Sequence, residues 1–236
     1  MFLPFKYFYL VLNIPFLLVW LILFIWNKST RKEQLLMSVL LMPAGPISEI
    51  LYFQDYWLPQ SVVPVSVFGH LFMIEDLLFV FSIGGIGGVI YEALMKRYAS
   101  EIKTEIHYSI TFPLIAAIAV IIGYSLFYLG MNSIFATSFA FLAGTALIVS
   151  QRRDLLANSL ISGLAVMAIM FLSYILGRII FVNAEEILKQ TWFLYGSGLG
   201  KKILGIPLTE MVWGFSWGAL AGPLYEFIKR FKNKRI

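Results

Sequence analysis

The 236-residue chain contains no cysteine and only two histidines, His70 and His107. Without cysteine it can form neither disulfide bonds nor thiolate metal sites. The two histidines lie at opposite ends of one expected helical segment, so they cannot bind one metal ion together. The sequence therefore predicts no metal site.

Charged residues are also scarce, at 13% of the chain against roughly a quarter in soluble proteins. Hydrophobic residues make up 60% of the chain, and the mean hydropathy is +0.83. The apolar run 5–26 is long enough for a transmembrane helix, which needs about 20 residues, whereas a barrel strand needs about 10 of alternating polarity. These features predict an all-α membrane protein.

Seven spans are expected, at about 5–26, 35–53, 72–94, 108–130, 134–150, 159–182 and 207–228. Most of the 18 basic residues follow the first, third, fifth and seventh spans, and therefore lie on one side of the membrane. Since this side is normally cytoplasmic, the N-terminus is predicted outside the cell membrane and the C-terminus inside. The first span has no signal-peptide cleavage pattern, so it is expected to be retained. The basic tail suits anionic lipid better than nucleic acid.

Two helix-length stretches, 74–92 and 208–226, resemble each other at an offset of 134 positions. The identities are Phe81 with Phe215, Ser82 with Ser216, Gly84 with Gly218, Gly88 with Gly222, Tyr91 with Tyr225 and Glu92 with Glu226. This similarity predicts an internal duplication of 3+1+3 plan: a three-helix repeat in 1–98, a linker helix in 99–132, and a second repeat with the basic tail in 133–236. Both repeats would begin with helices of the same direction, so they are expected to be parallel.

Carboxylates inside apolar helices are costly, which makes them functional candidates. Glu75, Asp76 and Glu210 have no cation nearby on their helices, and we predict them to be catalytic. Hydrogen bonding to neighbouring helices is the alternative. A buried carboxyl can keep its proton and act as a general acid. Adjacent helical residues point about 100° apart, so Asp76 is the better partner for its counterpart Glu210.

The other residues of the repeated helices have simpler interpretations. Glu92 and Glu226 lie near basic residues at helical spacing, which favours surface ion pairs. The glycines of 84–88 and their counterparts Gly218 and Gly222 indicate close helix packing, for which the two copies themselves are candidate partners.

Candidate substrate-binding residues lie on or near the same helices. They are Glu49, Trp57, Phe79, Arg178, Trp192 and Trp213. Arg178 is expected to reach the interface or to pair with Glu210 or Glu49. The aromatic segments 54–71 and 183–206 fit the membrane interface and could cap a cavity. Acids and aromatic faces together suit carbocation chemistry on a polyene, although aromatic residues are also typical of lipid-facing helices.

Short motifs recur in both halves. The second half contains Trp192-Phe193-Leu194-Tyr195, Gly205, Pro207-Leu208-Thr209-Glu210 and Leu224-Tyr225-Glu226; the first contains Ile50-Leu51-Tyr52 through Trp57, Gly69 and Met73-Ile74-Glu75-Asp76. These motifs resemble the lycopene cyclase domain of heterodimeric and fused carotenoid cyclases, which lack a flavin-binding domain. Neither half keeps the family's whole Pro-x-Glu-Glu motif, since Asp76 and Thr209 each replace a glutamate and the first half lacks the proline.

The resemblance implies an intramolecular lyase or isomerase that closes a ring at the end of a linear lipophilic polyene, with neither cofactor nor redox change. A protonated Glu75 or Glu210 would add a proton to the terminal double bond, and a carboxylate would later remove one. A non-enzymatic carotenoid- or isoprenoid-binding protein is the main alternative, and a small-solute transporter is a weaker one. A retinal protein is excluded, because the middle of the last span has no lysine. Membrane lipid is an expected partner, and the sequence leaves a homo-oligomer open.

Overall fold

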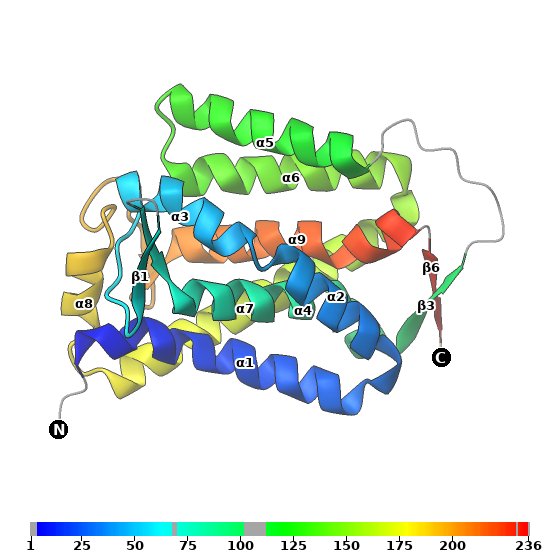
Figure 1. Cartoon of the computed structure of the whole chain (residues 1–236), viewed down its shortest axis with the longest axis horizontal. Coiled ribbons are helices and arrows are strands. Elements are labelled where there is room, and N and C mark those ends of the chain that lie inside the picture. Colours follow the sequence, from blue (N-terminus) through cyan, green and yellow to red (C-terminus); the bar gives the residue numbers. More distant parts are fainter. Residues whose placement is uncertain (1–3, 68–69, 102–111, 230, 236) are drawn as a thin grey trace.

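A computed structural model describes residues 4–67, 70–101, 112–229 and 231–235, and within them the chain is mostly helical (Figure 1). The helices are α1 (Phe8–Trp26), α2 (Arg31–Leu41), α3 (Ala44–Asp55), α4 (Ile74–Met95), α5 (Phe112–Tyr128), α6 (Ser133–Gln151), α7 (Leu156–Ile180), α8 (Ala184–Thr191) and α9 (Leu208–Lys229). Short 3-10 turns precede α1, α2 and α7, at Phe5–Tyr7, Lys28–Thr30 and Arg153–Leu155. Gly69, His107 and the start of the fourth expected span lie outside the described residues.

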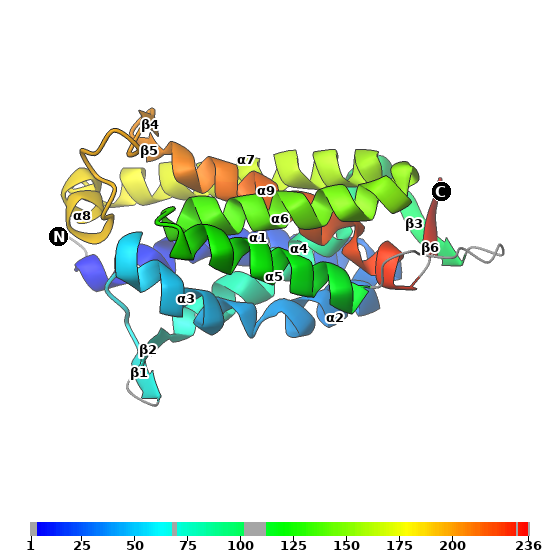
Figure 2. The same cartoon turned by 90° about the horizontal axis from the view of Figure 1, so that it is seen from above.

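In the described residues, three small antiparallel strand pairs lie near helix ends. Strand β1 (Pro64–Val67) pairs with β2 (His70–Met73), β3 (Arg97–Glu101) with β6 (Phe231–Arg235), and β4 (Lys202–Ile203) with β5 (Ile206–Pro207). The first pair and α8 lie at one end of the long bundle, and the β3–β6 pair lies at the other (Figures 1 and 2). We call these the α8 end and the β6 end.

Among the described residues, four helices are long and apolar enough to cross a membrane, at Phe5–Trp26, Ile74–Met95, Ser133–Gln151 and Arg153–Ile180. A fifth span is obtained if α2 and α3 are counted as one, although they are bent by 43°. The bend falls at Met42 and Pro43, where proline lacks the amide hydrogen needed to continue α2. The helical class is confirmed, whereas seven spans stay a prediction.

The outer faces of several helices are apolar. Leu18 and Ile25 of α1, Ile121 of α5 and Leu172 of α7 are each more than half exposed. Soluble proteins seldom present such continuous apolar surface, but lipid tails would cover it. The exposed faces are therefore compatible with a membrane protein.

Glycines allow close helix packing inside the bundle. A side chain at Gly84 or Gly88 would meet α2, whereas one at Gly218 or Gly222 would meet α7. Only Gly87 of this group faces the other copy of the repeated helix, at Ala221. The repeated helices thus pack mainly on α2 and α7, and the duplication itself stays a prediction.

Helices α4 and α9 run side by side in the same direction, both starting at the α8 end (Figures 1 and 2). Their first turns carry Asp76 and Glu210, and their last turns carry Glu92 and Glu226. On each helix the two acids are separated by about 24 Å at 1.5 Å per residue. The fold therefore gathers carboxyl groups at two distant places in the bundle.

Candidate active site

A narrow cavity of about 60 Å³ lies at the α8 end, and residues of α1, α3, α4, α6, α7 and α9 line it. Three of the lining residues are carboxylic acids, Glu49, Asp76 and Glu210. The lining also includes Tyr9, Tyr52, Tyr56, Trp57, Phe79, Tyr174 and Trp213. We call this cavity the acid chamber.

Asp76 enters the chamber from the first turn of α4. Its side chain is only 4% exposed, and the Tyr9 hydroxyl of α1 donates a hydrogen bond to Oδ1. Oδ2 is buried and has no hydrogen-bond partner among the described residues. One oxygen is thus fixed by a tyrosine while the other remains available to a ligand.

Glu210 occupies the matching first turn of α9. The Tyr56 hydroxyl donates a hydrogen bond to its Oε1, and Tyr174 of α7 also lies within hydrogen-bonding reach. Thr209 Oγ1 lies 3.1 Å from the Tyr56 hydroxyl oxygen and holds that tyrosine in place. Two tyrosines from different helices therefore orient this carboxyl group.

Glu49 is the least restrained of the three acids. Its side chain is 2% exposed, and within the described chain neither carboxyl oxygen has a hydrogen-bond partner. Tyr52 lies three residues after Glu49 on α3, and Tyr56, the residue that caps α3, lies four residues after Tyr52, which places all three side chains on one face. That face is the wall of the acid chamber.

Aromatic rings form much of the remaining wall. Phe79 and Trp213 stack with centroids 5.8 Å apart at an interplanar angle of 27°, and Phe16 meets Phe79 edge-on at 5.1 Å. Trp57 packs edge-on against Tyr9 at 4.8 Å. Ring faces next to carboxyl groups could stabilise a cation formed between them.

The chain after α3 and the chain at the end of α8 are joined beside the chamber. Backbone hydrogen bonds join Leu58 N to Thr191 O at 2.8 Å and Phe193 N to Tyr56 O at 2.9 Å. They form an isolated antiparallel bridge between Trp57 and Trp192. Trp57 lines the chamber, whereas Trp192 is buried behind it and does not.

The structure does not bring Glu75 into the chamber. Its carboxylate accepts hydrogen bonds from Ser61 Oγ and Val62 N, both at 2.6 Å. Glu75 therefore ties the segment before β1 to the start of α4. Of the three acids predicted to be catalytic, only Asp76 and Glu210 meet.

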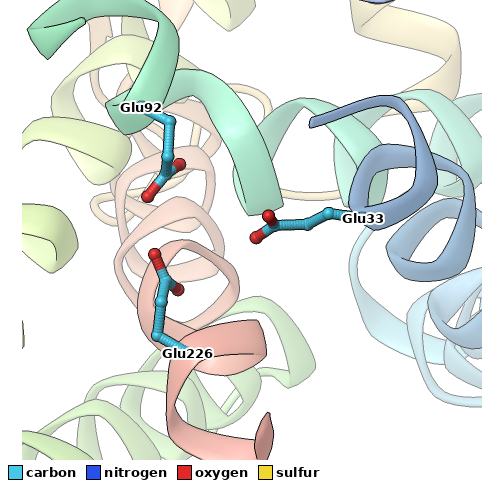
Figure 3. Close-up of side chains that lie close together, drawn as sticks. All are labelled: Glu33, Glu92 and Glu226. Carbon is cyan, nitrogen blue, oxygen red and sulfur yellow. The ribbon is translucent and has the colours of Figure 1, made fainter. Parts of the chain in front are cut away.

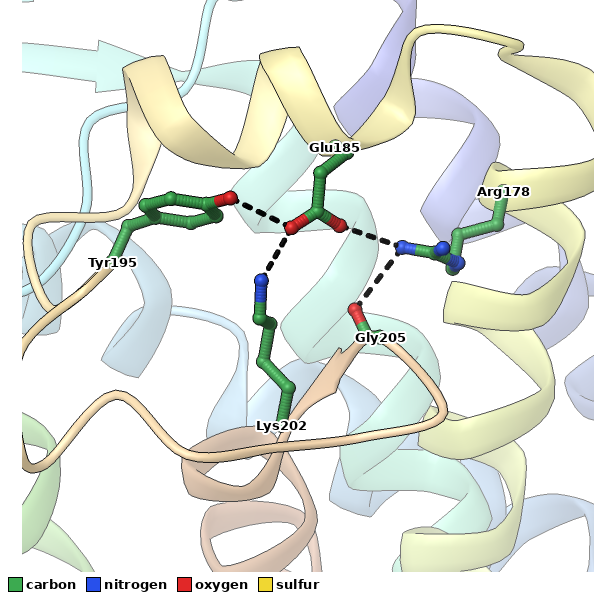
Figure 4. Close-up of polar contacts among 5 residues, drawn as sticks. All are labelled: Arg178, Glu185, Tyr195, Lys202 and Gly205. Carbon is green, nitrogen blue, oxygen red and sulfur yellow. Dashed lines mark hydrogen bonds and ion pairs between the residues drawn. The ribbon is translucent and has the colours of Figure 1, made fainter.

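Of the two alternatives for Arg178, the pairing with Glu210 or Glu49 is wrong. Its guanidinium binds Glu185 Oε2 at 3.0 Å and the Gly205 carbonyl at 3.2 Å, outside the chamber (Figure 4). Lys202 and Tyr195 donate to the other oxygen of Glu185. Hydrogen bonds from Lys202, Tyr195 and Arg178 lower the pKa of Glu185 to about 2, although burial opposes the shift, and Glu185 raises the pKa of Lys202. We call these residues the Glu185 clamp.

Sequence reasoning missed the tyrosines that orient the chamber acids. The helical spacing of Glu49, Tyr52 and Tyr56 could have indicated that these two tyrosines lie on the same helix face as the acid. Tyr9 and Tyr174 carried no such signal, because their partners lie 67 and 36 positions away in the chain and only the helix packing brings them together.

An apolar groove of about 400 Å³ adjoins the chamber between α3, α5, α6 and α9. Ser48, Tyr52, Val80 and Trp213 line both spaces. The Trp213 Nε1 donates a 2.8 Å hydrogen bond to the Tyr52 hydroxyl, so these two side chains stand together at the boundary. The groove thus shares a wall with a chamber containing three carboxyl groups.

Comparison with known proteins finds one family model that matches part of the chain. Residues 132–228 match the family model described as lycopene cyclase. The match covers α6 to α9 and includes Glu210, Trp192 and Trp213, but not Asp76 or Glu49. No curated protein and no solved structure matches the chain. The resemblance to the lycopene cyclase family is thereby confirmed, and it is carried by residues 132–228.

Proposed function

We propose that the protein is a membrane-embedded carotenoid cyclase that closes a ring at the end of a linear polyene by acid catalysis. The observation that carries the proposal is the acid chamber, in which three carboxyl groups and stacked aromatic rings adjoin an apolar groove. The family match independently supports a carotenoid cyclase-like function and a lipophilic polyene substrate.

The hydrogen bonds of the three acids suggest a different catalytic role for each. Asp76 Oδ2 and both oxygens of Glu49 have no partner in the described part of the chain, so a proton bound there can reach a substrate. We assign the first proton transfer, to the terminal double bond, to Asp76. Glu49 lies in the same chamber and can accept the proton that the ring later loses. The proton count balances, and the reaction is an isomerisation.

Glu210 is held by Tyr56 and Tyr174, which suits a fixed group better than a proton donor that must move. A carboxylate fixed in this way would stabilise the positive charge between the two proton transfers. The faces of Phe79 and Trp213 would add to that stabilisation while excluding water. Water exclusion matters because a captured cation would give an alcohol instead of a ring.

The two volumes suggest how a long substrate could bind. At about 60 Å³ the chamber has room for a few water molecules, whereas the groove, at about 400 Å³, lies in the range of roughly 300–1,000 Å³ typical of ligand pockets. We propose that the polyene tail lies in the groove and that Tyr52 and Trp213 move to admit the end group. The spans would place the N-terminus outside the cell membrane.

The groove can be tested by filling it. Ala119 of α5 lines it, whereas Ala117 on the same helix is exposed. We expect Ala119→Trp to lower ring formation at least tenfold because the new indole occupies the place of the tail. Ala117→Trp should have little effect. Equal loss in both variants, at equal protein levels in the membrane, would contradict a substrate in the groove.

The decisive experiment is expression in a host that accumulates lycopene, followed by chromatography of its pigments. The wild type should convert the linear pigment to cyclic products. Glu210→Gln should yield linear pigment alone, because the amide cannot supply the same negative charge. The matched control is Glu186→Gln, which changes an exposed acid on α8. Linear pigment that co-purifies unchanged with the wild type would instead establish a binding protein.

A further inference from the structure

A second set of buried acids lies at the β6 end, outside the acid chamber. Glu33 of α2, Glu92 of α4 and Glu226 of α9 point toward one another (Figure 3). Their exposed fractions are 5%, 1% and 0%, and one oxygen of each lies within 4.8 Å of an oxygen of the other two. We call this set the glutamate trio.

The burial of Glu92 and Glu226 corrects their interpretation as surface ion pairs. No salt bridge to either is found in the part of the chain that the structure describes. Their shared neighbour is the amide of Asn158 on α7, whose Nδ2 donates to Glu226 Oε1 at 3.1 Å and to Glu92 Oε1 at 3.4 Å. Ser162 Oγ donates to Asn158 Oδ1 at 3.0 Å, which orients the amide with its hydrogens toward the trio.

Each member of the trio also keeps an oxygen with nothing to bind. Glu33 Oε1, Glu92 Oε2 and Glu226 Oε2 are buried and lack a hydrogen-bond partner among the described residues. Glu33 is the most informative of the three, because it comes from a separate helix, receives nothing from Asn158 and still points into the same space. A buried carboxylate without a partner is strongly unfavourable, and mutual repulsion of three makes it more so.

The geometry suits a hard divalent cation. Three oxygens at most 4.8 Å apart can surround a point at most about 2.8 Å from each, which is close to the roughly 2.3–2.6 Å of Ca²⁺ ligands. Carboxylate oxygen is the donor that Ca²⁺ and Mg²⁺ prefer. We propose that the glutamate trio binds one such cation, Ca²⁺ or Mg²⁺, with Asn158 as the group that orients two of the ligands.

This site departs from the expectation of no metal, which rested on cysteine and histidine and did not consider buried carboxylates. Bound there, a cation would join α2 and α4 to α9 and so link the two halves of the chain. It lies about 24 Å along α4 from Asp76, so it is separate from the proposed ring-closing chemistry.

The test uses the full chain purified in detergent and stripped with a chelator. Its thermal midpoint is then measured with added CaCl₂ or MgCl₂ and with NaCl at equal ionic strength. At about 100 times the dissociation constant, the bound cation should raise the midpoint of the wild type by about 5–10 °C. The salt that gives the shift at lower concentration identifies the preferred ion.

Two variants make the result specific. Glu226→Gln removes one ligand while keeping the shape of the side chain, and it should abolish the shift. Glu186→Gln, on the exposed face of α8, should keep it. In the absence of a cation, Glu226→Gln should be at least as stable as the wild type, because the amide relieves repulsion.

Direct binding provides the second readout. Equilibrium dialysis with radiolabelled Ca²⁺, and its competition by Mg²⁺, should give one ion per wild-type chain and none for Glu226→Gln. The proposal is overturned if no ion binds and neither salt changes the thermal midpoint of the wild type. The trio would then share protons instead. An identical shift in Glu226→Gln also overturns it, since the ion would then act elsewhere.

Discussion

The two acid sets at opposite ends of α4 and α9 use the same side chains in different ways. In the acid chamber, the hydroxyl of Tyr9 binds Asp76, those of Tyr56 and Tyr174 bind Glu210, and aromatic rings line the cavity. In the glutamate trio, the carboxyl groups face each other, and the Asn158 amide is the hydrogen-bond donor that the described residues place beside them. The neighbours of a buried acid, more than the acid itself, determine whether it is suited to proton transfer or to cation binding.

Asp76→Asn, in the acid chamber, is expected to have the largest effect on ring formation. General acid–base groups contribute roughly 10²–10⁴-fold to a rate, so ring formation should fall by that factor. The adjacent Glu75→Gln should lose far less, because Glu75 binds Ser61 and Val62 outside the chamber. Pigment chromatography at matched protein levels measures both. Equal loss in the two variants would contradict the division of roles between these neighbours.

A smaller effect is expected at the other end, from Asn158→Ala. Groups that orient metal ligands typically change affinity by about 10–100-fold, so the variant should need that much more Ca²⁺ or Mg²⁺ for the same thermal shift. Ring formation reports on the chamber, and the titration of the thermal midpoint reports on the trio. Unchanged affinity would show that Asn158 does not organise the trio.

The smallest effect is expected from the Glu185 clamp, which belongs to neither set. Glu185 is 46% exposed, so its ion pairs are screened and Glu185→Gln should cost at most about 1 kcal/mol, or a few degrees in the thermal midpoint.

The pH dependence of this effect has a definite sign. The pKa of Glu185 is lowered to about 2, from a usual value near 4.3. The clamp therefore contributes stability above about pH 4.3, and that contribution is lost as the pH falls toward 2. A thermal scan of wild type and Glu185→Gln from pH 7 to pH 2 should show their difference disappearing. A difference that grows on acidification would contradict the clamp.

Much of the fold followed from composition, because long apolar runs with few charges leave helices as the main option. The break between α2 and α3 was harder to foresee, since 35–53 reads as one apolar run despite Pro43 and Pro46. Within the described residues, neither α5 nor α9 meets the length and hydropathy expected of a membrane span, so the seven-span plan stays untested. Sequence repeats show which helices are similar, but they do not show which other helices these pack against.

The site residues could be predicted where their position in an apolar helix was itself unusual for their chemistry. Asp76 and Glu210 could be singled out because an acid in an apolar helix is costly wherever it points. Glu75 and Arg178 could not be placed, because Glu75 binds a loop at Ser61 and Val62, and Arg178 binds Glu185 of the short helix α8, whose position follows from the loops around it. Glu92 and Glu226 were misread for a related reason: nearby lysines along a helix do not reveal that the carboxyl groups turn inward.

The bridge between Trp57 and Trp192 has a consequence for product formation. It fixes Trp57 in the wall of the chamber, and under the proposed function the polyene enters the chamber from the apolar groove. A linear carotene carries a reactive group at each end, yet only one end fits the chamber at a time. Under the proposed function it must withdraw, reverse and enter again before its second ring can form. Early time points should therefore be rich in pigment cyclised at a single end.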